Sequence, residues 1–184
     1  RLSAYRNVWW SLANEYDFMT IPIRPGHSGN KEMSDWDRFF SILQNEDPHH
    51  RFRGIHNGSK WYDHTKSWVS HGSIQSSKLD TGIVLREKYN KPVVFDECRY
   101  EGNIERGWGQ LTAKQMTERF WWGNMNGCYV GHGETYKAPE DILWWAKGGV
   151  LRGESPARIA YFRKIMEALP FTEMTPARQS TNVY

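Results

Sequence analysis

The stretch Lys91–Asn103, KPVVFDECRYEGN, decides the fold that this sequence predicts. Its apolar run Val93–Phe95 follows a proline and predicts a short buried strand, which ends in charged residues. A second stretch, Asn7–Ala13, predicts another buried strand and leads into Asn14–Asp17. Ligands and catalytic groups of parallel α/β proteins collect at the carboxyl ends of strands. The sequence therefore predicts that two strands each deliver a glutamate to the same end of a sheet.

The composition argues against several classes of function. The 184 residues can form one domain with a sizeable core, and 24 basic and 21 acidic residues are interspersed along the chain, with a net charge of +3. This charge pattern argues against a nucleic-acid partner, and no apolar run approaches the ~20 residues of a membrane helix. Cys98 and Cys128 form neither a disulfide framework nor a zinc motif. We interpret them as separate buried thiols rather than as a pair on neighbouring strands.

Predicted strands and helices alternate along the chain. Turn residues and proline separate the segments, and the apolar spacing changes from one segment to the next. The elements expected after the first strand are a helix from 34 to 43, strands at 52–55 and 68–75, a helix at 79–89, the strand at 93–95, a helix after 112, a strand at 127–131 and a helix at 155–169.

Three of these helices have recognisable starts. Ser34 with Asp37, and Thr112 with Gln115, have the spacing of capping boxes. Ser155-Pro156 predicts a helix with serine as N-cap and proline at the first helical position.

Five strands that alternate with helices predict a parallel α/β sheet, and two architectures fit. One is a complete five-stranded doubly wound sheet, and the other is the C-terminal part, about strands 4 to 8, of a TIM (β/α)8 barrel, which needs ~250 residues when whole. The doubly wound sheet would place a phosphate-binding loop after its first strand, where this chain has Asn14–Asp17. We therefore expect a partial barrel over residues 1–170. Residues 171–184 would begin a connection to a further domain, or a tail.

Two glutamates at strand ends carry a resemblance to a known group of enzymes. Asn14-Glu15 after one strand and Glu97 three strands later resemble clan A, the retaining glycoside hydrolases with an eight-stranded barrel. Together with CYVGHGET and LWWAKGGVLRGESPARIAYFRKIME, the stretch KPVVFDECRYEGN more narrowly resembles the apiosidase-like glycosidases of plant-glycan-degrading bacteria, over nearly all of the chain. The resemblance implies Glu15 as acid/base, Glu97 as nucleophile and Asn14 as a ligand of the sugar hydroxyl next to the anomeric carbon.

Glycosidic hydrolysis by this mechanism needs two carboxyl groups, since one protonates the leaving oxygen while the other attacks the anomeric carbon. Further polar residues stand at or near predicted strand ends and are expected to bind the substrate. They are His56, Gln75, His132 and Glu134. No two of the histidines His56, His71 and His132 have a recognisable ligand spacing, so neither a metal nor a cofactor is expected.

Alternatives remain open at this point. Asp96 and Glu101 compete with Glu97 for the role of nucleophile, and Trp144-Trp145 could be packing or a platform for a sugar ring. A glycan-binding or inactive barrel module and a metal-dependent barrel hydrolase compete with the glycosidase. The expected partners are an oligosaccharide or polysaccharide substrate and the remaining barrel strands, from the same longer protein or a second chain. The resemblance implies a secreted or periplasmic bacterial protein.

Overall fold

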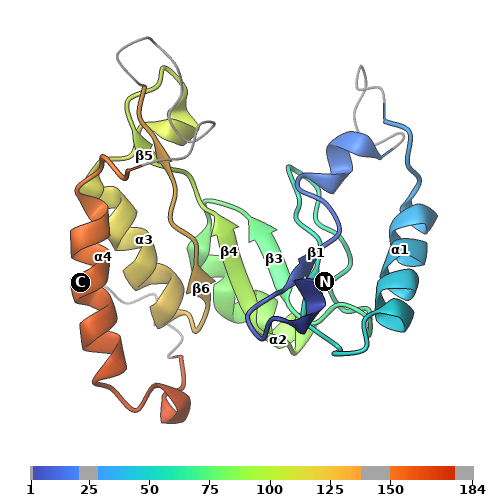
Figure 1. The fold of residues 1–184 in the computed structure, drawn as a ribbon. Helices are drawn as coiled ribbons and strands as arrows, with labels where there is room; N and C mark the ends of the chain where they lie inside the picture. Colours follow the sequence, from blue (N-terminus) through green and yellow to red (C-terminus); the bar gives the residue numbers. More distant parts are fainter. Residues whose placement is uncertain (1, 21–28, 138–149, 177–184) are drawn as a thin grey trace. The chain divides into compact units, whose positions relative to one another are not determined.

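A computed structural model describes residues 2–20, 29–137 and 150–176, which form two compact units (Figure 1). The first unit contains residues 1–75 and 85–94, and the second contains 76–84 and 95–184. The predicted Trp144-Trp145 pair lies outside the described residues. Within the described ranges, every helix is too short or too polar to cross a membrane.

The first unit is built on a short parallel strand pair. Its elements are η1 (Leu2–Ala4), β1 (Trp10–Ser11), η2 (Tyr16–Met19), α1 (Met33–Glu46), β2 (Arg53–Gly54) and β3 (Gly72–Gln75). Trp10 pairs with Arg53 and Ser11 with Gly54. Backbone hydrogen bonds continue this pairing beyond the strands, because the N–H of His56 donates to the carbonyl of Ala13 at 3.1 Å. The two loops that follow β1 and β2 are thus fixed against each other.

Aromatic rings fill the core of the first unit. Tyr16 packs edge-to-face on Trp36 and on Tyr62, with ring centroids 5.9 and 5.8 Å apart. Phe40 of α1 is fully buried against the same cluster, which the apolar spacing of this helix places on its inner face. The remaining members of the cluster are Ile55 and Val69. This core lies directly beneath the loop that carries Glu15.

The second unit combines two helices with short strands. Its elements are η3 (Leu79–Thr81), β5 (Glu101–Gly102), η4 (Gly107–Gly109), α3 (Ala113–Met125), β6 (Tyr129–Val130), β7 (Glu134–Thr135), α4 (Ser155–Glu167) and η6 (Phe171–Glu173). Helices α3 and α4 lie side by side (Figure 1), and Trp121 packs on Phe162 with ring centroids 4.7 Å apart. Helix α2 (Gly82–Tyr89) and strand β4 (Val93–Glu97) contribute residues to both units.

The prediction of a partial TIM barrel is wrong. The described strands form separate small sheets: a pair β1-β2, a pair β5-β7 and a three-stranded sheet in the order β3-β4-β6. Both pairs are parallel, as expected, but no sheet of the described residues has more than three strands or closes on itself. The five-stranded doubly wound sheet is not present there either. Alternation of strands and helices predicts parallel pairing, but it does not determine how many strands one sheet contains.

Helix starts were predicted with mixed success. The capping box of Thr112 and Gln115 is confirmed, with the N–H of Gln115 donating to the Thr112 hydroxyl at 3.2 Å. Helix α1 instead begins two residues earlier than predicted, with Glu32 rather than Ser34 as N-cap and the Asp35 carboxylate accepting the Glu32 N–H. Helix α4 has Glu154 as N-cap, so the predicted N-cap Ser155 is its first helical residue.

Both cysteines are separate buried thiols, as expected. Cys98 and Cys128 are thiols outside any disulfide of the described residues, and both are fully buried. Burial raises the pKa of the Cys98 thiol to about 11, so this thiol is neutral at physiological pH.

Candidate functional site

Glu15 stands at a strained position of the first unit. It precedes η2 with φ 48° and ψ 50°, a left-handed conformation that is rare outside glycine. The N–H of the following Tyr16 donates to the carbonyl of His56 at 3.0 Å, which fixes the turn after β1 to the turn after β2. Strain of this kind costs roughly 1–3 kcal/mol and persists only where the surroundings over-determine it. The backbone therefore holds Glu15 in a defined place.

A chain of polar side chains then orients the Glu15 carboxylate. The amide Nε2 of Gln75 donates to Glu15 Oε1 at 3.3 Å, and Gln75 Oε1 lies 2.9 Å from His56 Nε2. Since an amide oxygen only accepts, His56 must carry its proton on Nε2. Asn57 holds the backbone of Gln75 through two hydrogen bonds of 3.2 and 3.1 Å. Three of the predicted site residues, Glu15, His56 and Gln75, therefore form one network.

Asp17 fixes the loops that carry this network. Its fully buried carboxylate accepts the backbone N–H groups of Gly58, Ser59 and Lys60 at 2.6, 2.8 and 2.9 Å. Burial acts to raise the pKa of Asp17, but the three hydrogen bonds outweigh it and hold the pKa below the ordinary 3.8. The ionised carboxylate thus ties the turn that carries Glu15 to the loop that follows His56 and Asn57.

Glu97 is the last residue of β4, and its carboxylate accepts a hydrogen bond from the Tyr100 hydroxyl. Two features hold Tyr100 in place. Its ring packs edge-to-face on Trp108 with centroids 5.8 Å apart, and it lies so close to Gly133 that a Cβ there would come within 2.1 Å of the ring. Tyr100 therefore fixes the orientation of the Glu97 carboxylate.

His132 and Glu134 lie together in the second unit, beside Glu101. His132 Nε2 is 3.1 Å from the Ser155 hydroxyl and 3.7 Å from Glu134 Oε1. Burial lowers the pKa of His132 below 6.5, although Glu134 and Glu101 act in the opposite direction, so the imidazole is neutral at pH 7. Glu134 Oε2 accepts the N–H of Arg152 at 2.7 Å, while its buried Oε1 has no hydrogen-bond partner in the described part of the chain.

The potential ligand atoms of Glu101, His132 and Glu134 lie within 4.8 Å of one another, so we tested the group as a metal site. The distance of 3.7 Å from His132 to Glu134 is near the ~3.4 Å expected between two ligands of a tetrahedral zinc ion. Glu101, however, already accepts the N–H groups of Glu154 and Ser155 and the Tyr136 hydroxyl, at 2.9, 3.0 and 2.9 Å. A metal would displace these donors, so the cluster is better explained as an anchor for the start of α4.

The structure thus brings the predicted residues together in groups within each unit. The first unit joins Glu15, His56 and Gln75, with Asn14 exposed beside them. The second unit contains Glu97 with Tyr100, and the pair His132 and Glu134. The catalytic and substrate-binding roles of these residues stay predictions.

The supporting roles of two residues, Tyr100 and Glu101, were not predicted from the sequence. Tyr100 stands three positions after Glu97 and could have been noticed as a hydroxyl donor on the same loop. Glu101 was considered as a nucleophile, but its carboxylate is buried and occupied by the start of α4. The two-residue strand around it gives no apolar signal, so sequence alone could not locate it.

Comparison with known proteins gives one informative match. No protein-family model matches this sequence, and no curated protein matches it. The chain is similar to the crystal structure of a putative glycoside hydrolase from Bacteroides vulgatus ATCC 8482, with 36% sequence identity and a TM-score of 0.82. The match covers 92% of this chain and 32% of that protein, so the chain spans about a third of the length of its solved relative.

Proposed function

We propose that this chain belongs to a glycoside hydrolase. The observation that carries the proposal is the similarity to the Bacteroides vulgatus structure, since 36% identity over 92% of the chain is a likeness in sequence as well as in fold. The two orienting networks around Glu15 and Glu97 support it, because catalytic carboxyl groups must be held in defined positions.

The mechanism that we propose is double displacement. A carboxylate oxygen of Glu97 attacks the anomeric carbon while the bond to the leaving oxygen breaks and Glu15 donates its proton to that oxygen. Water then attacks the anomeric carbon and gives a proton back to Glu15, and the bond to Glu97 breaks. The Tyr100 hydroxyl would hold Glu97 for attack, and the Gln75–His56 chain would hold Glu15. We propose a plant-type or other complex glycan as the substrate.

The first prediction tests the nucleophile. Glu97→Gln keeps the size of the side chain but removes the attacking carboxylate, so we expect kcat to fall by about a thousandfold or more. Activity would be measured on a panel of plant oligosaccharides and aryl glycosides, with proton NMR to assign the anomer formed first. The matched control is Glu105→Gln, which changes an exposed glutamate of the same unit and should leave kcat unchanged.

Azide separates the two carboxyl roles. It should restore turnover of an activated glycoside by Glu15→Ala, because azide attacks the anomeric carbon in place of water and needs no base, so the bond to Glu97 breaks and a glycosyl azide is released. Wild-type turnover by Glu97→Gln would exclude the proposed mechanism. Saturable binding of an oligosaccharide without hydrolysis by the unmodified protein would instead favour the glycan-binding module.

A further inference from the structure

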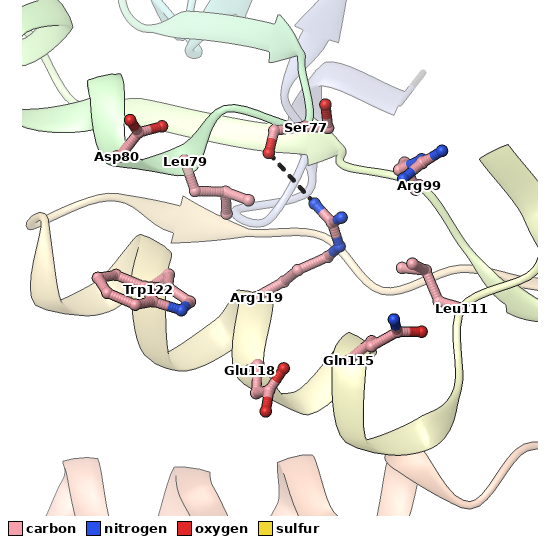
Figure 2. Close-up of a pocket in the computed structure, with 9 residues that line it drawn as sticks. All are labelled: Ser77, Leu79, Asp80, Arg99, Leu111, Gln115, Glu118, Arg119 and Trp122. Atoms are coloured by element: carbon pink, nitrogen blue, oxygen red, sulfur yellow. Dashed lines mark hydrogen bonds between the residues drawn. The ribbon is translucent and has the colours of Figure 1, made fainter. Parts of the chain in front are cut away.

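A cavity of about 420 Å³ opens in the second unit beside the end of β4 (Figure 2). Two arginines line it. Arg119 rises from α3 toward Ser77, and its guanidinium lies 3.4 Å from the Ser77 carbonyl oxygen. Arg99 follows β4 in a left-handed conformation with φ 77°. Leu111 and Trp122 supply apolar parts of the wall.

The two arginines of this cavity are not held in ion pairs within the described residues. Neither Arg99 nor Arg119 makes an ion pair with another described side chain. Asp80 and Glu118 also border the cavity, but Figure 2 shows both carboxylates lying away from the Arg119 guanidinium. Glu118 instead pairs with Lys114 at 3.8 Å on the surface of α3. The two guanidinium groups therefore line one concave site without a direct ionic partner, although two carboxylates stand at its border.

Arg119 offers more N–H groups than the described residues accept: one donates to the Ser77 carbonyl, and Cys98 is a further side-chain partner. The Nε of Arg119 is buried and has no hydrogen-bond partner among the described residues, although an arginine offers five N–H groups. Burial lowers the pKa of Arg119, and the nearby charge of Arg99 lowers it further, while Cys98 acts in the opposite direction. An anion in the cavity would offset the repulsion between the guanidinium groups and accept N–H groups that the two arginines present to the cavity.

We propose that this cavity is a binding site for an oxyanion, held by Arg119 and Arg99. Planar guanidinium groups match the spacing of two oxygens in a carboxylate, a sulfate or a phosphate, and the apolar wall leaves room for a small group attached to the anion. Free inorganic anions and acidic sugars share this chemistry. Neither Glu15 nor Glu97 lines this cavity, and the proposal does not depend on the proposed function.

The experiment measures binding directly. Phosphate, sulfate and glucuronate are titrated into the protein at constant ionic strength, with glucose as the neutral counterpart of glucuronate, and binding is followed by NMR shifts of the arginine side chains and by calorimetry. We expect saturable binding of the anions and none of glucose. Tighter binding of glucuronate than of phosphate would identify an acidic sugar as the source, and the reverse order would identify a free inorganic anion.

Variants assign the binding to this cavity. Arg119→Gln should weaken it about tenfold, the typical effect of losing one charge-assisted hydrogen bond. Lys114→Gln removes the same charge from the same helix outside the cavity and should change affinity less than twofold. If Arg119→Gln fails to fold, the variant Arg99→Asn tests the proposal instead. Arg99 is exposed and asparagine tolerates its left-handed backbone, so this variant should fold and bind the anion several-fold more weakly. No saturable anion binding, or an equal loss in Lys114→Gln, would overturn the proposal.

Discussion

Single residues of the first unit show how a buried charge can organise a loop. Asp17 is fully buried, yet it remains ionised because three consecutive backbone N–H groups point at its two oxygens. Removing a partner from a buried hydrogen-bonded charge leaves the others unsatisfied, which costs more than the interaction itself contributes. Asp17 is therefore the residue at which the loop that carries Glu15 is most sensitive to substitution.

The second prediction concerns this residue. Asp17→Asn places an amide group among three N–H donors, so we expect a loss of about 2–3 kcal/mol in the free energy of unfolding, measured by urea denaturation. Asp80→Asn, at an exposed aspartate, should change it by less than about 0.5 kcal/mol. Equal stability of the two variants would show that the carboxylate does not hold the loop.

The contribution of Asp17 to stability should depend on pH. Because the pKa of Asp17 in the folded protein lies below 3.8, its contribution is fully present above pH 3.8 and is lost as the pH falls through the lower, folded value. Asp17→Asn should therefore show a smaller loss of stability between pH 4 and pH 2 than the unmodified protein.

At the scale of single residues, much of the candidate site was readable from the sequence. Glu97 could be placed at a strand end because an apolar run stopped abruptly before it, and it is the last residue of β4; Glu15 instead lies four residues beyond Ser11, the last residue of β1. Their partners could not be placed, since Gln75 reaches Glu15 across 60 positions of the chain and nothing in a linear pattern marks that contact. The left-handed backbone of Glu15 was equally invisible, because glutamate has no preference for it.

Among the elements, helix α4 shows how a buried carboxylate can start a helix. Glu101 is 1% exposed and accepts the N–H groups of Glu154 and Ser155, two of the donors that a helix leaves unpaired at its first turn. Burial acts to raise the pKa of Glu101, but the hydrogen bonds from Ser155, Glu154 and Tyr136 outweigh it and keep the pKa below 4.5. A residue 53 positions away thus performs the role that the sequence assigned to Ser155.

The corresponding prediction is that Glu101→Gln destabilises the second unit by at least about 2 kcal/mol, because the amide offers one acceptor where the carboxylate offered two. Urea unfolding followed by tryptophan fluorescence would measure the change. Glu154→Gln is the control: its side chain is 78% exposed, while its backbone N–H still donates to Glu101. A loss of less than 0.5 kcal/mol in Glu101→Gln would show that α4 starts without this anchor.

Longer elements were predicted better than short ones. The helices at α3 and α4 and the strand β4 extend over enough residues for apolar spacing and caps to be visible. Strands β5 and β7 contain two residues each, and both include a buried glutamate rather than an apolar residue. Burial there follows from tertiary hydrogen bonds, which no local pattern encodes.

At the scale of the whole molecule, the error in the predicted fold has a simple origin. Parallel pairing was inferred correctly from alternation, but pairs of two residues, such as Trp10–Ser11 with Arg53–Gly54, do not report which further strands join them. The step from several parallel strands to a barrel came from excluding a doubly wound sheet, because Asn14–Asp17 stands where that fold would place a phosphate-binding loop, and the resemblance to barrel enzymes then agreed with it. The division into two units, with β4 contributing to both, was not predicted at all.

The two buried thiols make one of these units observable on its own. Cys98 and Cys128 both belong to the second unit, and the residues of the first unit include no cysteine. With the pKa of Cys98 raised from 9.0 to about 11, its reactive thiolate fraction is about a hundredfold lower than that of an exposed thiol. The rate at which the folded protein is alkylated then reports how often the second unit opens, because the buried thiols can react only in the open state.

We expect iodoacetamide at pH 8 to label the folded protein at least about a hundredfold more slowly than the urea-unfolded chain, as followed by mass spectrometry. Cys98→Ser would isolate the rate of Cys128, which should be similarly slow because both thiols lack exposed surface. Rapid labelling of either thiol would mean that the second unit opens freely. If labelling is slow, its rate can be used to detect oxyanion binding at Arg99 and Arg119. A ligand that binds the folded unit lowers the population of the open state and therefore lowers the labelling rate.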